Sequence, residues 1–414
     1  RFYFKEARLG FARALELDPN FAMAMLGLSR QSTDPEQGLA LVRRAAKERG
    51  RLTEHERRLV DMALAFREKK NDEGLRLARE LREKYPDDLR AATILAHEQL
   101  RKGNTDQGIR IFEELLAVDP NNAEAYNQIG YYYGYRGDYE KAVDNLKKYQ
   151  FIAADSANPF DSLGEVQAYS GHYNEAIENL NRALAIKPDF SPAYEHLGVV
   201  YEGTGEYAKA IESYRKAVEV ADTDDMKGKY LGEGMRAAFI THDLPAVADF
   251  RERFGRLAKD PYTEIRSAFL DAAVALAEGR AAEAEARLNK LRPQMDAKWQ
   301  GSGEFKLPGE KPYFPDWNYV MAKAKEAQGK TDEATALYEA NANPPRPFGN
   351  FESRRWIIEA RAKVAEIIAR KGDLDRAEKL IAENRKWNPS WAPCRSSEAA
   401  VAEARRAKVL AASR

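Results

Sequence analysis

Two short segments carry residue types that could bind a nucleotide. Residues 203–208 (GTGEYA) match the G-x-G-x-x-A pattern of dinucleotide-binding loops, but that loop must follow a strand, and here the preceding residues have the pattern of a helix. Residues 329–331 (GKT) resemble the end of a P-loop, yet Ala324 stands where that loop requires glycine. We therefore interpret both segments as turns between helices and predict no cofactor.

The histidines and the single cysteine do not form a recognisable catalytic or metal-binding pattern. The five histidines are scattered without the paired spacing of zinc ligands; they are His55, His97, His172, His196 and His242. Cys394 has no second cysteine to pair with and no histidine near it in the sequence. The G-x-S-x-G motif of serine hydrolases is absent from the sequence. We predict no catalytic residues and no metal site, and a protein that is not an enzyme.

The composition restricts the partners and the compartment. The chain has 66 Lys+Arg and 66 Asp+Glu, and a net charge of zero argues against nucleic acid as the main partner. Mean hydropathy is −0.65 and no apolar run is long enough to span a bilayer, so we expect a soluble chain without membrane insertion. The cytoplasm is favoured. The bacterial periplasm stays open if a signal segment was removed before Arg1.

A period of 34 residues organises the middle of the chain. Glycines recur at this interval, at Gly103, Gly137, Gly171 and Gly205. A small residue follows each glycine by five positions and an apolar residue comes four positions later; the pairs are Gly108 and Phe112, Ala142 and Leu146, Ala176 and Leu180, and Ala210 and Tyr214. Each half of the period carries an apolar stripe at helical spacing, and the glycine between the stripes suits a turn with positive φ.

This period predicts an all-α fold built from helical hairpins. Each hairpin leaves one apolar face that only a neighbouring hairpin can bury, so we predict a right-handed α-solenoid, or superhelix, of about ten or eleven hairpins.

The repeats resemble the tetratricopeptide repeat (TPR) family, most closely the repeat regions of bacterial proteins. One repeat matches seven of the eight signature positions of the family, through Phe160, Leu163, Gly164, Ala176, Leu180, Ala183 and Pro188. The next repeat matches through Tyr194, Leu197, Gly198, Tyr201, Ala210, Tyr214 and Ala217. The resemblance is specific over residues 89–221 and implies a scaffold for protein–protein interaction.

We expect five segments along the chain. They are a regular TPR-like array over 1–221 whose first repeat is truncated at residue 1, degenerate helical hairpins over 222–292, an insertion rich in proline, glycine and aromatic residues over 293–318, two further TPR-like hairpins over 319–391, and a C-terminal capping helix over 392–414. The composition of the insertion predicts a break in the helices. It is interpreted either as a surface excursion pinned by its aromatic residues or as a flap over a groove.

The resemblance also implies which residues contact a partner. In TPR proteins peptide contacts come from fixed positions on the concave face of each first helix. The residues at these positions of the 34-residue repeat are Arg90, His97, Arg101, Asn127, Tyr131, Tyr135, Asn158, Asp161, Glu165, Tyr169, Glu195 and Glu202. The groove so predicted runs from basic to acidic, and its acidic part has the wrong sign for the clamp with which chaperone-tail binders hold a carboxylate.

We therefore expect a scaffold or adaptor that binds an extended peptide or a short helix, neutral or basic, in the concave groove. Two alternatives stay open. One is a small-ligand-binding or enzyme-associated regulatory module closed by the 293–318 insertion, and the other is a scaffold that self-assembles through its stacked ends.

Overall fold

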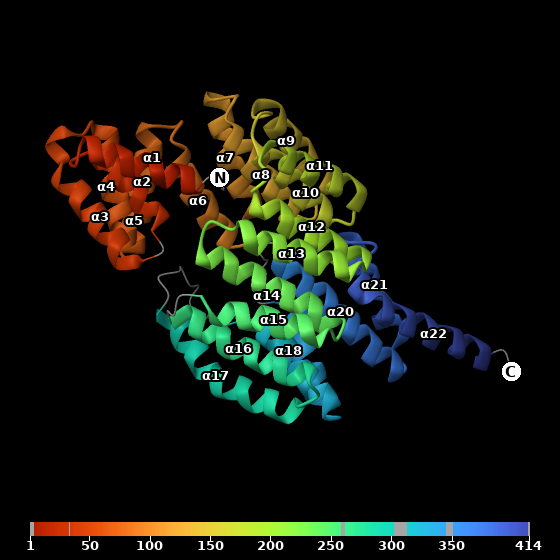
Figure 1. Cartoon of the computed structure of the whole chain (residues 1–414). Coiled ribbons are helices and arrows are strands. Elements are labelled where there is room, and N and C mark those ends of the chain that lie inside the picture. The colour runs from red at the N-terminus through yellow and green to blue at the C-terminus, as the bar shows by residue number, and fades with distance from the viewer. Residues whose placement is uncertain (1–3, 33, 258–260, 302–312, 345–350, 413–414) are drawn as a thin grey trace. The chain divides into compact units, whose positions relative to one another are not determined.

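The structure is a computed structural model that describes residues 4–32, 34–257, 261–301, 313–344 and 351–412. The described residues are helical and contain no strand. They divide into two compact units, one up to Tyr132 and one from Tyr133 onward, so that the division falls within one helix. Consecutive helices in each unit pack as hairpins, and the prediction of an all-α solenoid is confirmed (Figure 1).

The helices of the first unit are α1 (Phe4–Leu17), α2 (Ala22–Gln31), α3 (Pro35–Lys47), α4 (Glu54–Arg67), α5 (Asn71–Lys84), α6 (Leu89–Arg101), α7 (Thr105–Val118) and the first part of α8 (Ala123–Arg136), with a short 3-10 turn at Arg49–Arg51. From α2 onward the even-numbered helix is the first helix of each hairpin and the odd-numbered helix is the second.

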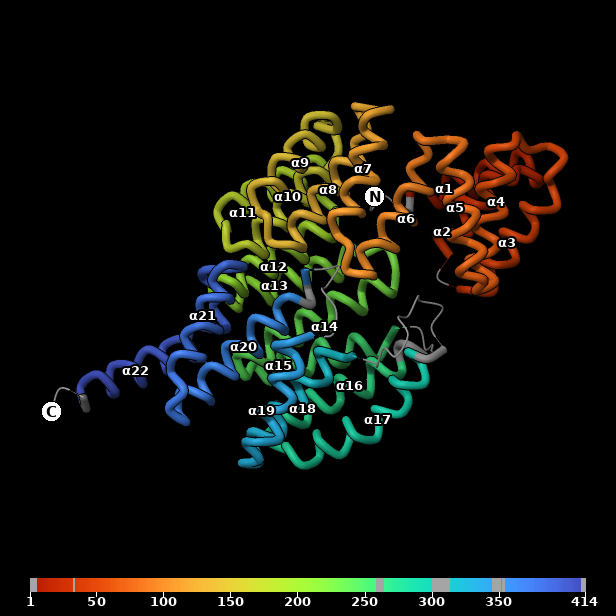
Figure 2. Tube along the Cα trace, turned by 180° about the vertical axis from the view of Figure 1, so that it is seen from behind, coloured from red at the N-terminus to blue at the C-terminus, as the bar shows by residue number. Residues whose placement is uncertain are grey.

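The second unit begins with the end of α8. It continues with α9 (Tyr139–Ile152), α10 (Ala157–Tyr169), α11 (Tyr173–Ile186), α12 (Ser191–Thr204), α13 (Tyr207–Val220), α14 (Asp224–Ile240), α15 (Leu244–Gly255), α16 (Pro261–Ala277), α17 (Ala281–Gly301), α18 (Pro315–Ala327), α19 (Thr331–Ala342), α20 (Glu352–Arg370), α21 (Leu374–Trp387), a 3-10 turn at Ala392–Cys394 and α22 (Arg395–Ala412). Within this unit α20 lies beside α14 (Figure 2).

The predicted turn glycines adopt the left-handed conformation that the hairpins require. Their φ angles are +80° at Gly103, +88° at Gly137, +82° at Gly171 and +88° at Gly205. In the hairpin of α14 and α15 the turn lies at 241–243, and His242 takes the left-handed position with φ +55°. The period thus encodes backbone conformation as well as apolar spacing.

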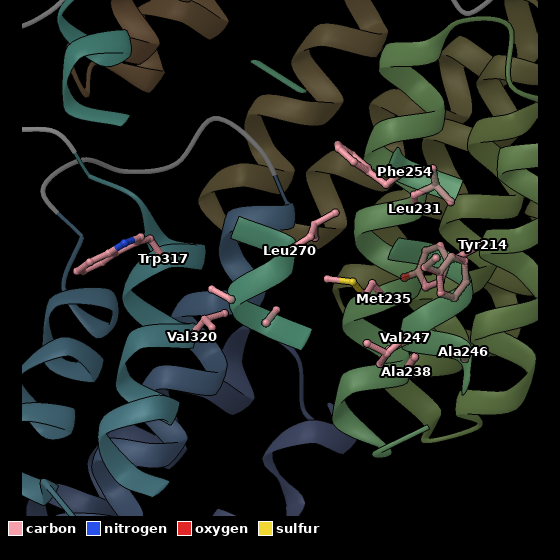
Figure 3. Close-up of a cluster of buried hydrophobic side chains, with 14 of the residues drawn as sticks. Tyr214, Leu231, Met235, Ala238, Ala246, Val247, Phe254, Leu270, Trp317 and Val320 are labelled. Carbon is pink, nitrogen blue, oxygen red and sulfur yellow. The ribbon is translucent and has the colours of Figure 1, made fainter. Parts of the chain in front are cut away.

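The core of the second unit extends from α13 to α18. Tyr214, Met235 and Phe250 belong to one cluster of buried side chains that also contains Trp317 (Figure 3). The indole nitrogen of Trp317 donates a hydrogen bond to the Leu288 carbonyl at 3.1 Å, so its one polar atom is satisfied inside the core.

The 293–318 insertion differs from its prediction. The helix break expected from 293 is wrong, because α17 continues through Pro293 to Gly301. Residues 302–312 of the insertion lie outside the described residues. On its far side Phe314 packs against the same core as Trp317, and the Tyr313 hydroxyl donates to Asn341 at 3.1 Å. These aromatic side chains therefore anchor the segment, and the five-segment division of the chain stays a prediction.

Replacing Gly137 by alanine tests the turn conformation. A Cβ built on Gly137 meets no atom within 4 Å, so Gly137→Ala should cost only the strain of the left-handed backbone, about 1 kcal/mol of unfolding free energy. Gly10 in α1 is an equally open glycine with a helical backbone, and Gly10→Ala should stabilise the protein by about 0.5–1 kcal/mol. Urea unfolding of both variants checks the prediction, and a stabilising Gly137→Ala would contradict it.

Candidate partner-binding faces

The predicted contact residues on the first helices of the hairpins differ in solvent exposure. Of the predicted contact residues, seven are buried: Asn127, Asn158, Asp161, Glu165, Tyr169, Glu195 and Glu202. Arg90, Tyr131 and Tyr135 are half-buried, and His97 and Arg101 are exposed. The buried members belong mostly to α10 and α12 of the second unit, where an exposed groove was expected.

The chain's own helix α20 covers this part of the inner face. At its start the ring of Phe351 stacks on that of Tyr169, with centroids 5.1 Å apart and planes 14° apart. The same ring also contacts Tyr135, at a centroid distance of 4.9 Å. Two predicted contact residues are therefore engaged by an aromatic side chain of the same molecule.

Arg354 attaches α20 to the end of α8. Its Nη2 donates to the carbonyls of Gly134 at 2.7 Å and Tyr135 at 2.9 Å, which lie at the negative end of the α8 dipole. The guanidinium also lies 4.2 Å from the ring centroid of Trp387. Burial lowers the pKa of Arg354 to about 9, and the hydrogen bonds to helix-terminal carbonyls partly replace its lost hydration.

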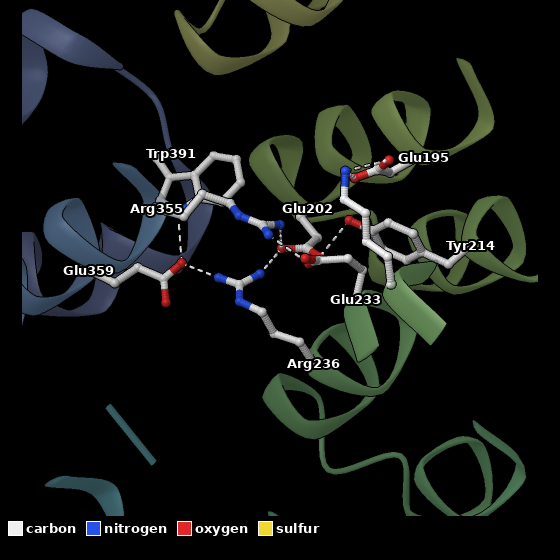
Figure 4. Close-up of polar contacts among 9 residues, drawn as sticks. Glu195, Glu202, Tyr214, Glu233, Arg236, Arg355, Glu359 and Trp391 are labelled. Carbon is white, nitrogen blue, oxygen red and sulfur yellow. Dashed lines mark hydrogen bonds and ion pairs between the residues drawn. The ribbon is translucent and has the colours of Figure 1, made fainter. Parts of the chain in front are cut away.

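A buried network of charged side chains joins α20 to α12 and α14 (Figure 4). Arg236 bridges Glu202 and Glu359 through its two terminal nitrogens. Burial alone would lower the pKa of Arg236, but the charges of Glu202 and Glu359 outweigh it and raise that pKa above its ordinary value. Arg355 contacts Glu233 at 2.6 Å.

Neutral donors complete this network. The Tyr214 hydroxyl donates to Glu202 at 2.9 Å, and the indole of Trp391 donates to Glu359 at 3.0 Å. Glu202 is 0% exposed, so these contacts replace the water that its carboxylate loses. The network therefore holds α20 against α12 and α14 and is not an open binding site.

The remaining acidic residues of the predicted groove have internal cationic partners. His196 lies 2.8 Å from Asp161 and 3.7 Å from Glu165. Burial lowers the pKa of His196, but the charges of both carboxylates and the hydrogen bond to Asp161 outweigh burial and raise it to about 10. Glu195 lies 2.8 Å from Lys229.

The expectation of a neutral or basic partner segment rested on these acids, so it needs correction. Asp161, Glu165, Glu195 and Glu202 neutralise cations of the same chain and are buried. A charge that is compensated inside the fold does not select an external ligand. Asp161 and Glu195 pair with residues one repeat later, 35 and 34 positions away, and assigning each repeat's residues by phase alone did not reveal these pairs.

The inner face of the first unit contains exposed residues, unlike that of α10 and α12. His97 of α6 is exposed, and its ring centroid lies 6.1 Å from that of Tyr132 on α8. Two polar atoms on the same helices are buried and make no hydrogen bond with any described residue, namely Nη1 of Arg90 and Oδ1 of Asn127. Arg101, farther along α6, is exposed like His97.

The described part of the chain contains neither a cluster of candidate metal ligands nor a membrane-spanning helix. No group of three or more His, Cys, Asp or Glu side chains there could hold a metal ion. Among the same residues, no helix combines the length and apolar character needed to cross a membrane.

Comparison with protein families gives three matches, which lie between residues 111 and 224. The model described as "TPR repeat" matches residues 164–205, and two models described as "Tetratricopeptide repeat" match residues 111–144 and 191–224. The chain therefore contains tetratricopeptide repeats, over residues 111–144 and 164–224. TPR repeats indicate a protein-interaction scaffold in general terms. Comparison with curated proteins gives no match.

Several solved structures are similar to this TPR protein. A tetratricopeptide repeat protein from Parabacteroides merdae shows 14% identity over 68% of this chain and 97% of that one, with a TM-score of 0.42. The pilF protein of Pseudomonas aeruginosa shows 19% identity over 55% and 95%, with a TM-score of 0.37. An O-GlcNAc transferase of Thermobaculum terrenum shows 26% identity over 31% of this chain and 26% of its own, with a TM-score of 0.28.

Removing one member of the buried network should destabilise the second unit. Arg355→Ala leaves Glu233 buried without its closest cation, and we expect a loss of about 3–5 kcal/mol of unfolding free energy. Hydrogen exchange should speed up in α12, α14 and α20. The control is Arg256→Ala, whose exposed pair with Glu252 should change stability by less than about 0.5 kcal/mol. Equal effects of the two variants would contradict a stabilising role of the buried network.

The charge on His196 predicts a pH-dependent contribution to stability. Its pKa is about 10 in the folded protein against an ordinary 6.5, so the stabilisation is fully present below pH 6.5 and is lost as the pH rises through about 10. Urea unfolding of wild type and His196→Gln at about pH 6, 8 and 10 should give a stability gap that narrows with rising pH. A gap that stays constant would show that the imidazole is neutral.

Proposed function

We propose that this TPR protein is a non-enzymatic scaffold or adaptor whose partner presents an extended peptide or a short helix to the inner face of the first unit. The observation that carries the proposal is that His97 and Arg101 of α6 are exposed, whereas the predicted contact residues of α10 and α12 are buried. An exposed face can contact a partner, whereas a face covered by the chain's own helix α20 cannot.

The remaining predicted contacts of α6 and α8 support the same location. His97 and Arg101 are exposed at the end of α6, and Tyr131 is half-buried on α8. Tyrosine offers a large contact area together with a hydroxyl, a combination common at interaction hot spots. We expect one such groove to bind with roughly micromolar affinity, because ordering a flexible segment offsets part of the contact energy.

Affinity capture with a matched pair of variants tests the proposal. The inner-face variant carries His97→Ala, Asn127→Ala and Tyr131→Ala, and the control carries Arg110→Ala and Glu113→Ala on the exposed side of α7. A partner protein should be recovered with wild type and with the control but lost with the inner-face variant. Circular dichroism verifies that both variants are folded.

A single substitution covers the case in which the triple variant fails to fold. His97 is exposed, so His97→Ala should leave the fold intact and still reduce capture. Equal capture by wild type and every variant would exclude the inner face of the first unit as the binding site.

A further inference from the structure

Lys323 of α18 has a side-chain environment unlike that of other lysines in the second unit. Its Nζ makes no hydrogen bond with any described residue, and it lies 3.9 Å from Oε2 of Glu326. In contrast, Lys216 donates to Glu219 at 2.9 Å, and Lys330 donates to a glutamate at 2.9 Å. The amine of Lys323 is therefore not held by a hydrogen bond to a carboxylate. Its side chain is 29% exposed, so a small reagent can reach it.

A second cation lies near this amine. Lys363 of α20 contacts Oε1 of the same Glu326 at 3.4 Å, so two ammonium groups share one carboxylate. Lys363 also donates to Glu366 at 3.2 Å, which gives it a second acidic partner. The ring of Tyr319, whose centroid lies 5.9 Å from the amine of Lys323, offers that amine only a weak cation–π contact. The surroundings therefore stabilise the ammonium form of Lys323 poorly.

These surroundings lower the pKa of Lys323. Burial has the largest effect and the positive charge of Lys363 the next, and they outweigh the attraction of Glu326, Glu359 and Glu366. Only the unprotonated amine is a nucleophile, and a lysine that is desolvated or next to another cation is activated in this way. Lys323 is thus accessible, lacks a hydrogen-bonded carboxylate and loses its proton more readily than an ordinary lysine.

We propose that Lys323 is a modification site whose ε-amine, activated by the neighbouring Lys363, takes an acyl group from a small thioester. The amine nitrogen attacks the thioester carbonyl carbon, and the new C–N bond replaces the C–S bond. The sulfur leaves with the bonding electron pair and takes up the proton that the nitrogen loses. The products are an amide and a thiol, so no other reactant is needed. This site is independent of the binding face proposed for the first unit.

The fold can accommodate the acylated side chain. Glu326 keeps the cation of Lys363 at 3.4 Å, and the Tyr338 hydroxyl donates to it at 3.0 Å. Acylation also removes the positive charge of Lys323 and with it the repulsion from Lys363. We therefore expect the modified protein to stay folded.

Site-resolved acetylation of the full chain tests the proposal. The protein is treated with a small uncharged acetyl thioester, and mass spectrometry of its peptides gives the initial rate at each lysine. Lys216 and Lys363 serve as controls within the same molecule, because Lys216 is more exposed but its hydrogen bond to Glu219 raises its pKa, and Lys363 is held by two glutamates. Lys323 should react at least about tenfold faster than either at neutral pH, since each unit by which a pKa falls raises the neutral fraction about tenfold.

The dependence of the rate on pH separates low basicity from simple exposure. Acetylation at each lysine should rise with pH and level off above the pKa of that amine, so the rate at Lys323 should level off at a lower pH than the rate at Lys216. A rate at Lys323 no higher than that at Lys216, or the same pH midpoint for both, would overturn the proposal.

A matched pair of variants tests the role of the neighbouring cation. Lys363→Gln should slow acetylation of Lys323 at least about threefold, because the amine loses a nearby positive charge and gains access to Glu326. The control is Lys371→Gln, whose exposed pair with Asp332 is remote from the site in sequence and should leave the rate unchanged. Circular dichroism verifies folding, and the comparison within wild type decides if Lys363→Gln does not fold. An unchanged rate in folded Lys363→Gln would overturn activation by Lys363.

Discussion

The second unit depends on the ion network that α20 brings to α12 and α14. Arg236 joins Glu202 to Glu359, two carboxylates from opposite ends of the unit's sequence, and Arg355 is only 2% exposed. Removing any one of these charges leaves another buried without compensation, which costs far more than the intact network contributes. Because the charges must stay together, α20 stays docked, and the inner face that it covers is closed.

This docking makes the second unit more than a stack of neighbours. In an ideal solenoid each repeat contacts only the adjacent repeats, and stability is a sum of nearest-neighbour terms. Here the pair of Arg236 and Glu359 spans 123 positions, and Arg354 reaches carbonyls 219 and 220 positions away. We therefore expect α8 to α14 to unfold together with α20 as one cooperative region, whereas the first unit follows the nearest-neighbour pattern more closely.

The docking of α20 makes the polar inner face of the second unit differ from that of the first unit. In the second unit the acids meet cations of their own chain, as His196 meets Asp161, and these pairs offset part of the desolvation. In the first unit His97 and Arg101 of α6 are exposed. This difference in exposure is why we propose the inner face of the first unit as the partner-binding face.

The sequence by itself determined the repeating unit. Glycine at Gly103 and its successors, the small residues that follow and the apolar stripes all act within a few turns of one hairpin, so a period of 34 residues was enough to predict the helices, their turns and the TPR family. It also predicted His97 and Asn127 as inner-face positions. Only the tertiary structure decided which inner-face residues are accessible. A carboxylate such as Glu202 has the same local pattern whether it faces solvent or an arginine from another hairpin, because long-range pairing leaves no mark on local periodicity.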